Sequence, residues 1–254
     1  MAEVTIVESA EQAGSIAAGI IASLVSAKPD AVLGLATGST PLSTYRALAG
    51  LDLSQVRGFA LDEYVGLPAG HPESYRAVIT REVVEPLGLT PSRVRVPADD
   101  GLPLSGAGER YEADIHAAGG IDLQILGIGR TGHIGFNEPG SSLASLTRVK
   151  TLAAVTRADN ARFFDSIDDV PKHCITQGLG TILRARHLVL LAFGSAKAAA
   201  VAAALEGPVS ASTPGSVVQL HPRVSVILDE EAASQLEHAD YYRYAWDNRL
   251  DWER

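Results

Sequence analysis

The sequence is poor in cysteine and in positive charge, and both shortages narrow what the protein can do. Cys174 is the single cysteine among 254 residues, which excludes an internal disulfide and a metal cluster held by several cysteines. Lysine and arginine number 21 against 30 aspartates and glutamates, for a formal net charge of -9. This balance argues against a general nucleic-acid binder, which needs clustered cations, but it leaves room for a small anionic ligand.

Signals for export or membrane insertion are also missing near the start of the sequence. Residues Met1–Val7 lack the basic stretch that opens a secretory signal. The longest early apolar run, Ile16–Val25, is broken by Gly19 and Ser23 and is too short to span a bilayer. We therefore predict a cytoplasmic protein with no membrane partner.

No sequence pattern indicates a metal or a cofactor. The seven histidines show no H-E-x-x-H motif or similar close spacing. Residues Gly127–Gly132 match the G-x-G-x-x-G dinucleotide fingerprint, but Gly135, Pro139 and Gly140 oppose the helix that this fingerprint requires. We predict that the protein uses neither a metal nor a nucleotide cofactor.

Short apolar runs alternate with helical patterns along most of the chain. Strands are expected at Ala31–Ala36, Ile121–Leu126, His187–Phe193 and Val224–Leu228, and three of these four are nearly continuous apolar runs. Helices are expected at Glu11–Ser26, Pro41–Leu48, Pro72–Val84, Gly106–Ala117, Ile175–Leu183 and Ala196–Leu205. The alternation predicts an α/β fold with a doubly wound, mostly parallel, Rossmann-like sheet flanked by helices, in a single domain over residues 1–254.

Two segments stand apart from this alternation. Residues 157–172 are polar and hold four aspartates, so we expect a lid segment at about 152–175. Residues 239–252 concentrate three tyrosines and two tryptophans. This tail should dock on the body of the protein or on another subunit.

The junction Thr37–Pro41, between a strand and a helix, is the first candidate site. Pro41 suits the first helical turn, Gly38 allows a tight turn, and Ser39 and Thr40 add hydroxyl donors beside free helix N–H groups. Such a junction at the carboxyl edge of a parallel sheet can hold a phosphate. An ordinary helix cap has the same pattern, so the motif alone leaves both interpretations open.

Two further segments carry groups suited to acid–base chemistry. His133 and Glu138 can form a pair in which the carboxylate orients or charges the imidazole. A structural histidine and a turn glutamate are the alternatives. Asp62 and Glu63 stand where a strand pattern ends, and adjacent side chains of an extended chain point to opposite sides. Only one of these acids can face a cleft, and the spacing does not say which.

At these segments the sequence resembles the glucosamine-6-phosphate deaminases. The resemblance rests on GLATGSTPLSTY at 34–45, LDEYVGLP at 61–68 with HPESY at 71–75, and LGIGRTGHIGFNEPG at 126–140. Shorter matches follow in order at 141–145, 162–165, 170–172, 194–197 and 219–222. Together they cover the chain from about residue 31 to the tail.

The resemblance implies an aldose–ketose isomerisation coupled to deamination, in which glucosamine 6-phosphate and water become fructose 6-phosphate and ammonium. In the family pattern Asp62 is the base that removes the sugar C2 proton. His133 assists opening of the pyranose ring, with Glu138 as its carboxylate partner. The implied phosphate ligands are Gly38, Ser39, Thr40, Arg162 and Lys197.

The sequence departs from the family at Thr131, where Asp or Asn usually precedes the Gly-His pair. A threonine hydroxyl can accept a hydrogen bond from an imidazole N–H but brings no charge, so Glu138 remains the charged partner in this loop. Ser141, Arg148 and Lys150 match family positions of an N-acetylglucosamine 6-phosphate effector site in hexameric members. Arg148 and Lys150 also fit a solvated strand face, which leaves both regulation and a homo-oligomer open.

Two other functions compete with this interpretation. A 6-phosphogluconolactonase-type hydrolase would share the fold and a similar phosphate turn, but would not need the segment 61–68 in this form. A non-catalytic sugar-phosphate sensor would normally be fused to a DNA-binding helical module, and only about 30 residues precede the first apolar strand.

Overall fold

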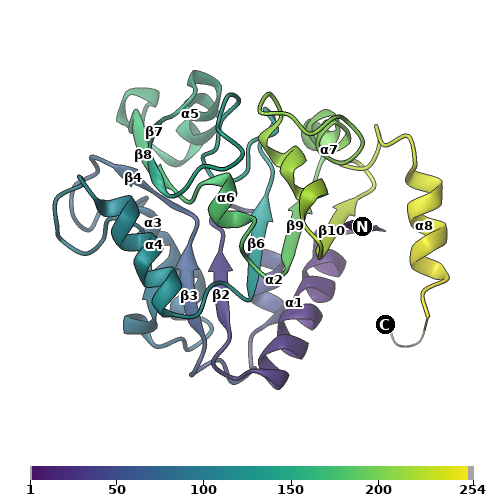
Figure 1. The fold of residues 1–254 in the computed structure, drawn as a ribbon, viewed down its shortest axis with the longest axis horizontal. Coiled ribbons are helices and arrows are strands. Elements are labelled where there is room, and N and C mark those ends of the chain that lie inside the picture. The colour runs from purple at the N-terminus through teal and green to yellow at the C-terminus, as the bar shows by residue number, and fades with distance from the viewer. Residues whose placement is uncertain (1, 251–254) are drawn as a thin grey trace.

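A seven-stranded parallel sheet forms the centre of the structure, a computed structural model that describes residues 2–250 (Figure 1). The strand order is β1-β10-β9-β6-β2-β3-β5, and every neighbouring pair is parallel. The strands are β1 (Ala2–Val7), β2 (Val32–Leu35), β3 (Arg57–Ala60), β5 (Val94–Arg95), β6 (Leu123–Gly127), β9 (Leu188–Ala192) and β10 (Val224–Asp229). The predicted doubly wound, mostly parallel sheet is confirmed, and β1, β3 and β5 are strands that the four predicted apolar runs did not include.

Helices flank this sheet, and most begin and end close to where the sequence predicts. They are α1 (Ala10–Ala27), α2 (Leu42–Ala47), α3 (Tyr75–Ile79), α4 (Ala107–Ala117), α5 (Ala154–Asn160), α6 (Leu179–Ile182), α7 (Ala198–Leu205) and α8 (Ala239–Asp247). The predicted helix Ile175–Leu183 is wrong over its first part. Ile175 and Thr176 end a buried strand, and the helix begins only at Leu179, because this apolar stretch pairs with strands on both sides.

That strand belongs to a second, three-stranded antiparallel sheet that the sequence analysis did not predict. Its order is β4-β8-β7, from β4 (Asp62–Val65), β8 (His173–Thr176) and β7 (Arg148–Thr151). In Figure 1 the arrowheads of the large sheet point toward this small sheet and α5. A separate apolar cluster packs the small sheet against the loop after β6 and the segment between β7 and β8. Its buried members are Tyr64, Phe136, Leu152, Val170 and Cys174.

The order of the strands places a crevice between β2 and β6. From β2 the chain moves outward to β3 and β5, and it then returns to β6 on the other side of β2. The loops that follow β2 and β6 therefore diverge at their carboxyl ends. In doubly wound sheets this switch point is where ligands bind.

Helix α1 contains the apolar run Ile16–Val25, and the whole helix is longer than this run. The helix has 18 residues and a mean hydropathy of 1.2, so length and composition alone would allow it to span a membrane. In the fold, however, it packs against α2 and the sheet. Ala13, Ala17, Ile21 and Val25 form its buried stripe at helical spacing.

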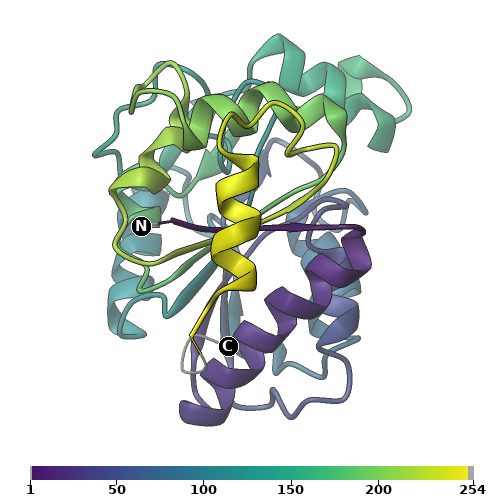
Figure 2. The same ribbon diagram turned by 90° about the vertical axis from the view of Figure 1, so that its right-hand side faces the viewer.

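The beginning and the end of the described chain meet at one edge of the large sheet. β1 forms this edge and pairs with β10, and α8 lies against β1 (Figure 2). The aromatic tail therefore docks on the body of the protein, which was one of the two expected arrangements. Trp252, the last aromatic residue of the tail, lies outside the described residues.

Candidate active site

A cleft of about 930 Å³ opens at the crevice between β2 and β6. Its walls come from the loops after these two strands, from β4, and from α5 with the residues that follow it. Seven residues predicted from the sequence line this cleft: Gly38, Ser39, Thr40, Asp62, His133, Arg162 and Lys197. Segments separated by more than a hundred residues are thus brought to one place by the topology.

Of the two adjacent acids Asp62 and Glu63, it is Asp62, the first residue of β4, that faces this cleft. Asp62 is 6% exposed, and the nearby Thr176 hydroxyl and Phe136 backbone favour its ionised form. Gly135 approaches so closely that a Cβ there would lie 3.4 Å from Asp62 Oδ2. Burial, with a smaller contribution from the Glu63 charge, raises the pKa of Asp62 to about 8.

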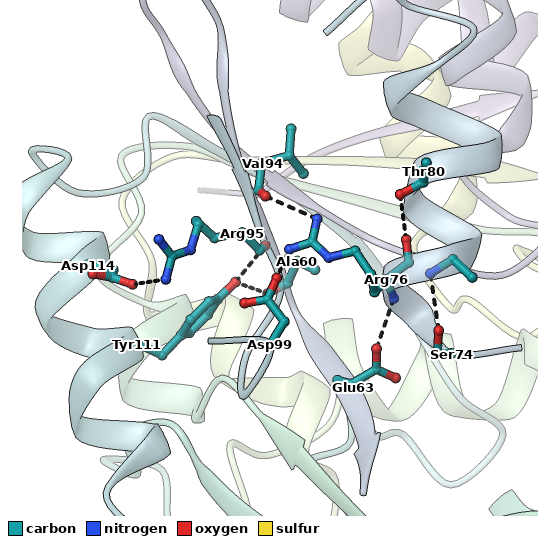
Figure 3. Close-up of polar contacts among 11 residues, drawn as sticks. Ala60, Glu63, Ser74, Arg76, Thr80, Val94, Arg95, Asp99, Tyr111 and Asp114 are labelled. Atoms are coloured by element: carbon teal, nitrogen blue, oxygen red, sulfur yellow. Dashed lines mark hydrogen bonds and ion pairs between the residues drawn. The ribbon is translucent and has the colours of Figure 1, made fainter. Parts of the chain in front are cut away.

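Glu63 points away from the cleft and serves the backbone instead. Its Oε1 accepts hydrogen bonds from the backbone amides of Tyr64 at 2.7 Å and Tyr75 at 2.8 Å. Its Oε2 accepts one from the amide of Arg76 at 2.8 Å (Figure 3). The structure therefore separates the two adjacent acids as an extended chain requires, and it gives Glu63 the structural part.

A polar network behind β4 fixes the point where β3 passes into β4 (Figure 3). The Arg76 guanidinium donates to the carbonyl of Val94 at 3.1 Å and pairs with Asp99. The Tyr111 hydroxyl donates to the carbonyl of Ala60 at 2.7 Å. The Tyr111 contact ties α4 to Ala60, two residues before Asp62, and the Arg76 contacts join α3 to β5 and the loop that follows it.

His133 lies on the backbone of its own loop. A Cβ at position 129 would lie 2.1 Å from His133 Cε1, so only glycine fits beneath the ring. Thr131 Oγ1 lies 2.9 Å from Nδ1, and Glu138 Oε2 lies 3.4 Å from it. These neighbours occupy Nδ1, which leaves Nε2 to exchange a proton with a ligand in the cleft.

The same loop explains why the dinucleotide fingerprint misleads. Gly129 makes room for His133, and the amide of Gly132 donates to the carbonyl of Gly129 at 2.9 Å to close a tight turn. Residues 128–140 contain no helix. The fingerprint glycines therefore shape the loop that carries His133 and do not open a dinucleotide-binding helix.

Glu138 divides its two oxygens between separate parts of the site. Oε2 accepts a hydrogen bond from Thr131 Oγ1 at 3.3 Å on the His133 side, whereas Oε1 accepts one from Thr156 on α5. Burial favours the neutral acid, but the hydrogen bonds from His133 and Thr156 lower the net pKa of Glu138 below its ordinary value. Thr156 was missed by the sequence analysis, because no local pattern links it to Glu138.

Positive charge gathers at the other end of the cleft. Lys197 follows β9 in a short 3-10 helix, Ser195–Lys197, and Arg162 lies in another, Ala161–Phe163, directly after α5. Burial lowers the pKa of Lys197, and the charges of Arg130 and Arg162 lower it further. Arg130, which the sequence analysis did not single out, also lines the cleft, where it pairs with Asp159 of α5.

The three residues of the predicted effector site do not line this cleft. Ser141 is buried, and its hydroxyl has no hydrogen-bond partner among residues 2–250. Arg148 lies on β7 and donates to Asn137 Oδ1 at 2.9 Å. Lys150 shares the same face of β7, two residues on. This group stays a predicted site, separate from the catalytic residues.

The sequence profile of the glucosamine-6-phosphate isomerases/6-phosphogluconolactonase family matches residues 6–227. The chain belongs to this family.

Relatives within the family agree over nearly the whole length of the chain. A glucosamine-6-phosphate deaminase of Bifidobacterium longum strain NCC 2705 is 60% identical over 100% of this chain and 99% of its own length. That of Streptomyces coelicolor is 55% identical over 99% of both chains. A solved structure, described as a monomeric glucosamine-6-phosphate deaminase, covers 92% of this chain and 99% of its own with 43% identity and a TM-score of 0.88.

The lactonase branch of the family shares only the fold at this level of similarity. The 6-phosphogluconolactonase of Trypanosoma brucei is 19% identical, with a TM-score of 0.73 over 93% of this chain and 99% of its own. The high-identity relatives therefore point to the deaminase branch, and the sequence resemblance to that branch is confirmed.

Proposed function

We propose that the chain converts glucosamine 6-phosphate and water into fructose 6-phosphate and ammonium. The observation that carries the proposal is one cleft in which a buried carboxylate, Asp62, faces the same space as His133, whose Nδ1 lies 3.4 Å from Glu138 Oε2 behind it. Relatives 55–60% identical over essentially the full chain are named for this activity. The lactonases, below 25% identity, lend support to the fold alone.

The phosphate of the substrate would bind at the cationic end of the cleft. Lys197 and Arg162 supply charge, and the Gly38–Thr40 turn supplies backbone amides and two hydroxyls. Gly38 has a φ of 88°, a conformation that favours glycine. Charge-assisted hydrogen bonds anchor the substrate away from the reacting carbons, so that binding and chemistry use different ends of one cleft.

Ring opening is the step assigned to His133. Its free Nε2 takes the proton of the C1 hydroxyl and delivers one to the ring oxygen, which yields the open-chain aldehyde. The imidazolium that forms in between is stabilised by Glu138, 3.4 Å from Nδ1. Thr131 donates to Glu138 and accepts from Nδ1–H, so it holds the tautomer without adding charge.

Isomerisation is the step assigned to Asp62. The carboxylate removes the C2 proton and returns a proton to C1, while the C2 ammonium group gives one proton to O1. The resulting iminium at C2 adds water and releases ammonium. Burial makes the ionised carboxylate a strong base, because its pKa is raised to about 8. The substrate ammonium on C2 favours that ionised form when it arrives.

A coupled assay for ammonium release from glucosamine 6-phosphate tests the proposal. We expect one ammonium for each fructose 6-phosphate formed. Hydrolysis of 6-phosphogluconolactone without ammonium release would replace the proposal with a lactonase. Binding of sugar phosphates without turnover of either substrate would replace it with a sensor.

Three further properties stay proposals alongside this function. A small-molecule substrate of this kind fits a cytoplasmic enzyme of amino-sugar catabolism. We infer that Ser141, Arg148 and Lys150 form an effector site, which predicts faster ammonium release in the presence of N-acetylglucosamine 6-phosphate. Sedimentation of the purified protein decides whether it is a homo-oligomer or, like the structural relative described above, a monomer.

A further inference from the structure

The N-terminus of α5 lacks a cap of its own. Ala153 is the cap residue of this helix, and its side chain accepts no hydrogen bond. The carboxylate of Glu138, from the loop after β6, contacts this end of the helix instead. Its Oε1 accepts from the buried hydroxyl of Thr156, and the backbone amide of Ala153 also favours its ionised form. The catalytic carboxylate is therefore also part of the structure of α5.

The polar face of α5 reaches both ends of the loop that carries His133. Asp159, three residues after Thr156, accepts a hydrogen bond from Arg130 Nε at 3.0 Å at the start of that loop. Asn160 donates to the hydroxyl of Tyr64 on β4 at 2.8 Å. Residues three and four apart lie on one helix face, so a single docking surface contacts Glu138, Arg130 and the strand of the base.

We propose that Thr156 is a positioning residue for ring opening. Its hydroxyl fixes Oε1 of Glu138 and so presents Oε2 to Thr131 and the Nδ1 of His133. This inference rests on the proposed function, because ring opening is the step that uses His133. It adds that the proton-shuttling pair is complete only when α5 is docked on the loop.

A purely structural hydrogen bond would behave differently from a positioning one. If Thr156 only stabilises α5, its loss lowers the melting temperature and leaves turnover per folded molecule unchanged. If it positions Glu138, its loss lowers kcat while the distant phosphate anchor keeps KM the same. The two roles therefore separate in the division of the effect between kcat and KM.

The experiment compares Thr156→Val, which removes the hydroxyl at constant shape, with Thr156→Ser, which keeps it. We expect kcat for ammonium release to fall roughly 10- to 100-fold in Thr156→Val, the range for a hydrogen bond to a charged group, with KM within about twofold. Thr156→Ser should recover most of the loss. Thr156→Ala replaces Thr156→Val if the latter does not fold.

A matched control is available elsewhere in the same fold. Thr181 on α6 donates from a buried hydroxyl to Glu112 Oε1 at 2.5 Å, outside the cleft. Thr181→Val therefore removes a threonine–carboxylate hydrogen bond of the same type and should lower the melting temperature without changing kcat. An equal loss of kcat in both variants, an unchanged kcat in Thr156→Val, or no recovery in Thr156→Ser would each overturn the proposal.

A second readout does not depend on catalysis. A ¹³C NMR titration of the Glu138 carboxyl in the free protein follows the group directly. His133 faces it from its own loop, Cys174 from β8, and Thr156 and the Ala153 amide from α5. We expect the pKa of Glu138 to rise in Thr156→Val and to return in Thr156→Ser; no rise overturns the proposal. If the wild type releases no ammonium, the proposed function fails. The titration still shows whether the Thr156 hydroxyl stabilises the ionised carboxylate of Glu138.

Discussion

The two sheets of this protein differ in almost every physical respect. Every residue of β9, at the middle of the large sheet, is buried, whereas the residues of β7, at an edge of the small sheet, alternate between half-buried and exposed. The large sheet supplies the apolar core and the crevice; the small sheet and α5 supply the base and the partners of the acid–base loop. The large sheet holds most of the buried apolar side chains and the small sheet holds Asp62, so substitutions in the two sheets should separate stability from turnover.

The sharpest test of this contrast is Asp62→Asn, in the small sheet. The change keeps the shape but removes the proton acceptor, so kcat should fall by roughly two to four orders of magnitude. Glu63→Gln is the matched control on the opposite face of β4. It should cost stability, because Glu63 accepts three backbone amides, and should reduce kcat less. A larger loss of kcat in Glu63→Gln would exchange the roles of the two acids.

The large sheet should respond in stability and not at the site. Leu190→Ala, at the fully buried centre of β9, should lower the free energy of unfolding by about 2–5 kcal/mol. Val149→Ala on β7, where the side chain is 41% exposed, should cost within about 0.5 kcal/mol. Denaturant titration measures both. Comparable losses would mean that the small sheet carries as much of the core as the large one.

A substitution at the cationic end of the cleft should change substrate binding and not turnover. Lys197→Ala should raise KM for glucosamine 6-phosphate about 10- to 100-fold with little change in kcat, because the phosphate is held alike in ground and transition states. Lys172, an exposed lysine outside the cleft, gives the control substitution Lys172→Ala. An unchanged KM for Lys197→Ala would remove this residue from the site.

At Asp62, the ionisation that activates the carboxylate should also destabilise the fold. The pKa of this carboxylate is raised from 3.8 to about 8 by burial, so the folded protein binds this proton more tightly than the unfolded chain does. The fold therefore loses stability as pH rises through this interval, while kcat/KM rises as the base ionises. Melting temperatures at about pH 5 and about pH 9 should show Asp62→Asn gaining on the wild type at the higher pH. Parallel curves would mean that Asp62 titrates normally.

The difference between the two sheets also explains which strands could be predicted from the sequence. Continuous apolar runs identify β2, β6, β9 and β10, since strands buried on both faces leave that pattern. Strand β7 has no apolar run to reveal it, because two of its four residues are charged. A solvated strand face was nevertheless one interpretation of Arg148 and Lys150. The apolar pattern places the start of a helix at Ile175, the third residue of β8, because so short a stretch does not reveal its pairing partners.

The site shows a similar division. Spacing alone left Asp62 and Glu63 equivalent, and the family resemblance chose between them before the geometry did. The approach of Glu138 to His133 was expected from their shared loop. Thr156 and Arg130 could not be found in this way, because their contacts arise when α5 docks on a segment far away in the sequence. Tertiary docking leaves no local pattern to detect.

The edge of the large sheet has a consequence for how the chain is made. Strand β1 pairs with β10, whose residues are synthesised about 200 positions later. At roughly 5–20 residues per second, α1 therefore waits about 10–40 s on the ribosome before the strand it packs against exists, with α2 as its early cover. A helix that is apolar enough to pass for a membrane segment thus lacks part of its final packing during this interval. Chaperone demand during translation should follow the apolarity of α1 more closely than the stability of the finished fold.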